Sequence, residues 1–101
     1  MNEYLLESIL ASIEVPFTLQ GDTAGKYIES IRTIAAADAT SLAWIDPARG
    51  DRQQLLDATK AAAVISDGSL TLAPHQHAAT VLIAVAQPKL AIIRIAEKFF
   101  A

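Results

Sequence analysis

A single tryptophan closes a short apolar run and is followed at once by a turn signal. Residues 41–45 read Ser-Leu-Ala-Trp-Ile, and Asp46-Pro47 ends the run. An aromatic ring at a strand end, beside a loop, can stack on a flat ligand such as a nucleobase. The loop that follows contains Asp46 and Arg49. The Asp46 carboxylate can accept a hydrogen bond from a ring N–H. The Arg49 guanidinium can stack on a base or pair with a phosphate. Trp44 is therefore interpreted either as a stacking platform or as a core side chain.

The segment from Gly21 to Tyr27 looks at first like a phosphate-binding loop. Only three residues separate Gly21 from Gly25, instead of four. Tyr27 stands after Lys26 where a magnesium-binding Ser or Thr is required. The spacing therefore predicts a turn that connects two strands.

The remaining polar residues form no pattern typical of catalysis. His75 and His77 could supply half of a metal site, but the chain has no cysteine, and Asp67 is the nearest carboxylate in sequence. A solvated loop after Pro74 is predicted instead. No Ser–His–Asp or Cys–His arrangement is visible, and the 11 acidic residues are scattered. The sequence thus predicts no catalytic residue, no metal site and no cofactor.

Composition limits the classes of partner. With 101 residues, 52% of them hydrophobic and 19% charged, the chain is one domain that is apolar for its size. We expect part of that apolar surface to meet a partner or a neighbouring domain. A net charge of −3 with scattered basic residues argues against nucleic acid. Residues 1–14 lack the basic start of a signal peptide, and the apolar run at 78–86 is too short to span a bilayer. A cytoplasmic protein is expected.

Apolar periodicity predicts the elements that position Trp44. The first predicted helix covers residues 3–14, with Asn2 as its N-cap. A second, short helix is predicted directly after Asp51, which would cap it. The third is predicted from Pro88 onward, with Gln87 as its cap. Strands are predicted over 15–19, 27–34, 41–45, 61–66 and 80–85, whereas 35–39 fits a helical turn or a loop. Continuous apolar strands between helices predict an α/β class, with α+β as the alternative, of about five strands and three helices.

The order of several segments is similar to that of a known family. These are Gly21-Asp22, Ile-Glu-Ser-Ile at 28–31, Ala-Asp-Ala-Thr-Ser-Leu-Ala-Trp-Ile-Asp-Pro at 37–47, Ala-Ala-Ala-Val-Ile at 61–65, Val-Leu-Ile-Ala-Val-Ala-Gln-Pro-Lys-Leu-Ala at 81–91, and Phe99-Phe100. The chain resembles the N-terminal non-repeat domain of UDP-3-O-acylglucosamine N-acyltransferase, an enzyme of lipid A (lipopolysaccharide) biosynthesis. The resemblance implies a small α/β fold similar to the N-terminal domain of the Mur ligases. It also implies that the domain holds the uridine of a UDP-acylglucosamine-type nucleotide sugar.

By this resemblance Trp44 stands where the family has the aromatic that stacks on uracil, and Asp46-Pro47 stands where it has Asn-Pro. One residue is missing between the aromatic and that pair. A carboxylate at position 46 only accepts hydrogen bonds and would repel a diphosphate, and Ala48-Arg49 replaces the usual tyrosine. Our hypothesis from these residues is that uracil stacks on Trp44 and lies between it and the Arg49 guanidinium, with Asp46 and Arg49 at the rim of the site.

In that family a left-handed β-helix of hexapeptide repeats follows this domain and carries the catalytic histidine. Residues 1–101 contain no such repeats, so we expect a substrate-binding module that is not catalytic by itself. Acyl carrier protein would be a partner only through the missing domain. Either a monomer or weak self-association through the wide apolar face of the final helix, residues 88–100, is expected. The alternative is a protein-interaction or assembly module that kept the fold and lost nucleotide binding, which the altered loop 46–49 favours. An independent small enzyme has the least support.

Overall fold

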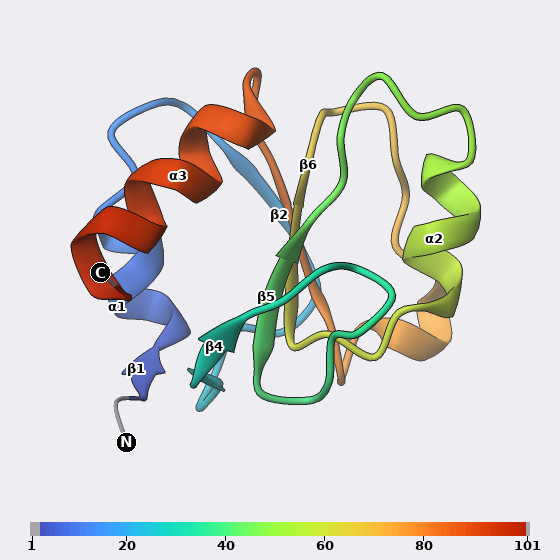
Figure 1. Cartoon of the computed structure of the whole chain (residues 1–101). Helices are drawn as coiled ribbons and strands as arrows, with labels where there is room; N and C mark the ends of the chain where they lie inside the picture. Colours follow the sequence, from blue (N-terminus) through green and yellow to red (C-terminus); the bar gives the residue numbers. More distant parts are fainter. Residues whose placement is uncertain (1–2, 101) are drawn as a thin grey trace.

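Five strands form a mixed central sheet that is covered by helices on both faces (Figure 1). The computed structural model describes residues 3–100. The strand order is β2-β7-β6-β5-β4, and β4 to β7 are parallel whereas β2 runs antiparallel to β7. The bounds are β2 Thr18–Gln20, β4 Ser30–Ile31, β5 Ser41–Trp44, β6 Ala63–Ser66 and β7 Val81–Ala84.

The two faces of the sheet carry separate cores. Helices α1 (Leu6–Ala11) and α3 (Pro88–Phe99) cover one face, and α2 (Arg52–Ala58) covers the other (Figure 1). Side chains alternate along β5, so Leu42 joins the core under α1 and α3 while Ala43 joins the core under α2. A short 3₁₀ helix, η1 (Pro74–Gln76), lies beside α2, because the Gln76 amide donates to the Leu56 carbonyl at 2.8 Å. The predicted α/β class is confirmed.

The predicted central strands are confirmed, and the structure shows that they pair in parallel. Leu42 of β5 pairs with Ala63 of β6, which pairs with Val81 of β7. All three side chains are fully buried. Strands that are buried on both faces need continuous apolar sequence, which is why these segments were identifiable from the sequence alone.

The first predicted helix is shorter than residues 3–14. Tyr4–Leu5 form β1, which pairs antiparallel with β3 (Tyr27–Ile28) in a separate two-stranded sheet. Helix α1 therefore starts at Leu6, whose N–H donates to the Lys26 carbonyl at 2.8 Å. It ends where the Ser12 hydroxyl donates to the Ile9 carbonyl at 2.6 Å. The predicted cap Asn2 lies outside the described residues.

The prediction of one strand over 27–34 was wrong, because the segment divides at Glu29 between two sheets. Residues 27–28 pair with β1, and β4 pairs with β5. The Glu29 N–H donates to the Thr40 carbonyl at 2.8 Å, and the chain then loops through residues 32–40. The strand predicted over 15–19 starts only at Thr18. Pro16 has no N–H for a ladder, which accounts for the late start.

The loop between β2 and β3 is the strand-connecting turn that the spacing predicts. Gly21 has a φ of 102°, and the Asp22 N–H donates to the His77 carbonyl at 2.9 Å. The Lys26 ammonium donates to the Ala78 carbonyl at 2.8 Å, so this lysine is bound to the main chain before β7. No helix within residues 3–100 is long and apolar enough to cross a membrane.

Candidate functional site

The carboxyl ends of the parallel strands meet at one edge of the sheet, as in other α/β folds where ligands bind. Strand β6 ends at Ser66, and the chain then turns toward the α2 face. Strand β7 ends at Ala84, and the chain then enters α3 on the opposite face. Connections that leave neighbouring strands toward opposite faces open a crevice between those strands. The best-placed site on this sheet is therefore the carboxyl edge between β6 and β7, with the end of β5 as the next strand along.

Two hollows open near this edge and adjoin at shared lining residues. One of about 340 Å³ is bounded by residues 16–18, Gly68 and residues 84–86, at the start of β2 and the ends of β6 and β7. The other, of about 740 Å³, lies between residues 12–16 and helix α3. Pro16 and Ala86 line both. Both volumes lie within the range of small-molecule sites.

Trp44 is the last residue of β5 and is half-buried. Its ring packs against the core under α1 and α3, which also contains Leu42 two residues earlier. The ring thus contributes to the core and keeps part of its surface accessible at the carboxyl edge. Both predicted roles, core packing and a stacking platform, are compatible with this burial.

Asp46 and Arg49 form a tight turn after β5. The exposed Asp46 carboxylate accepts the Ala48 N–H at 2.9 Å, and the Asp46 carbonyl accepts the Arg49 N–H at 3.1 Å. This Asx-type turn accounts for the choice of Asp before Pro47 on structural grounds alone. One carboxylate oxygen of Asp46 is thereby engaged by the main chain.

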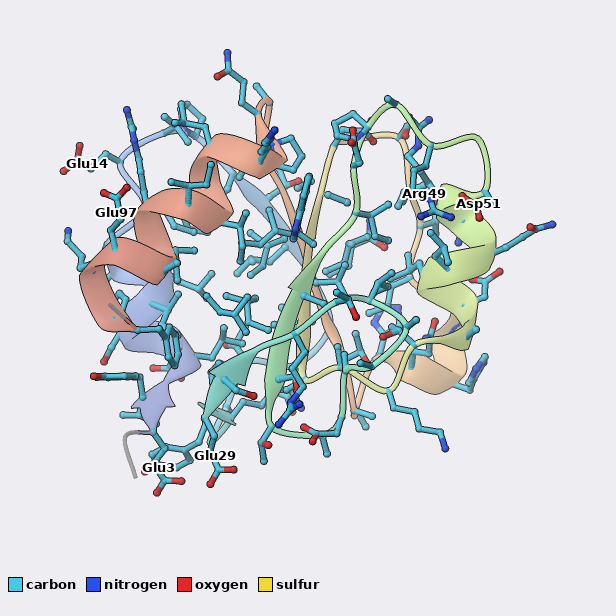
Figure 2. The ribbon with its side chains drawn as sticks, viewed as in Figure 1. Glu3, Glu14, Glu29, Arg49, Asp51 and Glu97 are labelled. Atoms are coloured by element: carbon cyan, nitrogen blue, oxygen red, sulfur yellow. The ribbon has the colours of Figure 1, made fainter. Side chains whose placement is uncertain are left out.

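The Arg49 guanidinium pairs with Asp51 rather than with Trp44. Its Nε and Nη2 atoms donate to the two carboxylate oxygens of Asp51, each at 2.9 Å. This bidentate bond holds the pKa of Asp51 below its ordinary value and raises that of Arg49. The pair lies beside the start of α2 (Figure 2), whereas Trp44 packs on the face of α1 and α3.

The predicted capping roles of Asp51 and Gln87 need correction. Both residues occupy the N-cap positions of α2 and α3, but neither side chain makes a capping hydrogen bond. The Asp51 carboxylate is held by Arg49, and only its carbonyl accepts a helical bond, from the Leu55 N–H at 3.0 Å. Pro88 is in the first turn of α3, as predicted.

Arg52 and Asp67 are two polar residues at this edge that sequence reasoning missed. Arg52 Nη1 donates to the Pro47 carbonyl and lies 3.3 Å from Asp67 Oδ2. It therefore ties the loop after β5 to the loop after β6. Asp67 also accepts the Ser69 N–H at 3.0 Å and the Ser69 hydroxyl, and the Ser69 side-chain bond is the main cause of its lowered pKa. The available signal was the position of Asp67-Gly68 directly after a buried strand.

The two histidines lie apart from this edge. His75 is in η1 and His77 follows it, and both are exposed. Within residues 3–100 no group of three or more His, Cys, Asp or Glu side chains could hold a metal ion. The two imidazoles are exposed, as in the predicted solvated loop, but residues 74–76 form a 3₁₀ helix instead of an irregular loop.

The chain matches no model of a known protein family, and a comparison with curated proteins finds no significant match.

Proposed function

We propose that this domain binds the uridine end of a UDP-sugar at the carboxyl edge of its sheet. In this proposal it is the substrate-binding module of a lipid A-type UDP-3-O-acylglucosamine N-acyltransferase, or a relative of that module. The acyl carrier protein would engage a separate catalytic domain. The observation that carries the proposal is the half-buried Trp44 at the carboxyl end of β5, where it pairs with Ile65 of β6, one of the two strands that border the crevice.

The stacking geometry follows from the way Trp44 is held. A ring whose one side packs on the core is fixed in orientation, so a base that stacks on it pays little cost for ordering the side chain. Base–aromatic stacking contributes about 1–3 kcal/mol. Since a millimolar dissociation constant corresponds to about 4 kcal/mol, the isolated domain would bind UDP no better than millimolar.

Arg49 can take part only if its pair with Asp51 opens. Both side chains are largely exposed, and exposed pairs of this kind contribute little net free energy. A diphosphate can compete with the Asp51 carboxylate for the Arg49 guanidinium, because phosphates and carboxylates bind a guanidinium in the same bidentate manner. The Asp46 carboxylate opposes that gain, so the base contributes more to binding than the phosphates do.

Saturation-transfer difference NMR tests the proposal from the side of the ligand. Irradiating protein methyl groups should transfer saturation to the uracil ring protons of UDP-N-acetylglucosamine more than to its sugar protons. Trp44→Leu should abolish the transfer, whereas His75→Ala, at an exposed position away from the edge, should leave it unchanged. An equal transfer to uracil in wild type and Trp44→Leu would refute a stacking role.

The second candidate is a protein-interaction module that lacks nucleotide binding. A specific observation favours it: the polar groups of the loop after β5 are already engaged within the chain, Asp46 by Ala48 and Arg49 by Asp51. Under this alternative Trp44 is only a core side chain, and no uridine nucleotide would receive saturation.

A further inference from the structure

The 740 Å³ groove lies on the side of the molecule away from the Arg49–Asp51 pair. Glu14 and Glu97 mark it on the α1 and α3 side of the fold, opposite Arg49 and Asp51 (Figure 2). Apolar side chains form both of its walls: Ile13, Val15 and Pro16 on one side, and Leu90, Ala91 and Ile95 on the other.

Exposed apolar side chains gather at this groove. Val15 and Leu90, which line it, are 42% and 40% exposed, and Ile93 on the next turn of α3 is 43% exposed. These are three of the six large apolar residues that are exposed within residues 3–100. An apolar surface that gathers in one place is typical of an interface.

The charged residues that line the groove itself are balanced in sign and have no ion-pair partner among the described residues. Glu14, Arg94, Glu97 and Lys98 line the groove, so two acids and two bases surround the apolar residues. The ion pairs found within residues 3–100 are Arg49–Asp51 and Arg52–Asp67. The four groove charges therefore have no ionic partner inside the described part of the chain.

A balanced set of charges fits a second copy of the same surface better than a partner of one charge. In a two-fold symmetric dimer, if residue i of one copy contacts residue j of the other, then residue j of the first copy contacts residue i of the second. Arg94 and Glu97 are about one helical turn apart on α3. If two copies of α3 cross in antiparallel directions about an axis between these residues, each Arg94 lies opposite Glu97 of the other copy. An acidic or a basic partner would leave two like charges unmatched.

We propose that the α3 surface, defined as Val15, Leu90, Ile93 and the four charged residues Glu14, Arg94, Glu97 and Lys98, is the interface of a two-fold symmetric homodimer. Leu90 and Ile93 form its apolar centre, and the charges form a self-complementary rim. The proposal is independent of nucleotide binding, because it rests on the groove and not on Trp44.

Sedimentation equilibrium of the purified protein tests the interface through two charge-reversal variants. Wild type should approach twice the mass of the single chain between about 10 µM and about 1 mM. Glu14→Lys/Glu97→Lys carries four basic rim residues, and Arg94→Glu/Lys98→Glu carries four acidic ones. Each variant alone should dimerise at least roughly tenfold more weakly, because like charges now face each other. An equimolar mixture should regain the dimer, because the two rims are complementary.

Leu19→Ser is the matched control, since Leu19 is 41% exposed on β2 and lies outside the α3 surface. It should dimerise like wild type, and circular dichroism should show all variants folded. A wild-type chain that stays at single-chain mass throughout the range would overturn the proposal. With both variants folded, a mixture that dimerises no better than its separate components would also overturn it. Leu90→Ser is a second test that changes no charge: it should weaken association, and an unchanged dimer would overturn the proposal as well.

Discussion

Gly21 is the glycine at which a single methyl group should cost the most stability. Its φ of 102° lies in a region that side-chain-bearing residues rarely adopt. A Cβ there would stand 2.4 Å from the Thr80 carbonyl oxygen and 3.2 Å from the Val81 Cα. The Thr80 main chain cannot easily move, because its hydroxyl donates to the Ala61 carbonyl at 2.8 Å in the buried sheet.

The size of the effect for Gly21→Ala follows from three contributions. The left-handed backbone costs an alanine about 1–2 kcal/mol. The contact with the Thr80 carbonyl requires the start of β7 to shift, which adds about 1–3 kcal/mol. Reduced freedom of the unfolded chain returns about 0.4–1 kcal/mol. Unfolding free energy should therefore fall by about 3 kcal/mol, within a range of about 1–5 kcal/mol.

Urea unfolding followed by far-UV circular dichroism measures this change against two matched glycines. Gly25 has a φ of 70° but open space around it, so Gly25→Ala should cost only about 1 kcal/mol. Gly68 has neither a positive φ nor a neighbour within 4 Å, so its alanine variant should stay within about 0.5 kcal/mol of wild type. If Gly21→Ala lost no more stability than Gly25→Ala, the close approach to Thr80 would be refuted.

Two further predictions concern carboxylates held by their neighbours. Asp38 accepts the Ser41 hydroxyl at 2.8 Å, the main cause of its lowered pKa. The stability it contributes is therefore full above the unfolded pKa of about 3.9 and is lost as pH falls through the folded value. Asp38→Asn should flatten the fall of the urea midpoint below about pH 4, and an unchanged slope would contradict this assignment. Arg52→Met removes the tie between the Pro47 carbonyl and Asp67 and should cost about 1–2 kcal/mol in urea unfolding. Arg49→Met, whose ion pair is exposed, should cost clearly less, and the reverse order would contradict the tie.

The central sheet was predictable because local sequence carried the necessary signal. Residues 41–45, 61–66 and 80–85 are continuous apolar runs, as strands buried on both faces must be. Pro88 marked the start of α3 because a proline costs nothing in the first turn.

Partner choice between distant segments was not predictable in the same way. The alternation at 27–34 indicates extended chain, but nothing in it says that the first half pairs with Tyr4–Leu5 and the second half with β5. The same holds at the candidate site. Trp44 was identified by its type and position, whereas the ion pair between Arg49 and Asp51 depends on how the turn folds. Arg52 became visible only when the loops after β5 and β6 lay side by side.

The most direct test of nucleotide binding is the indole N–H signal of Trp44, because the chain contains one tryptophan and the signal needs no assignment. Isotope-labelled protein is titrated with UDP-N-acetylglucosamine to several millimolar, with N-acetylglucosamine alone as the control. The proposed function predicts a saturable shift of the indole signal with the nucleotide sugar and none with the sugar. An indole signal that does not move at any concentration would contradict uridine stacking and leave Trp44 as a core residue.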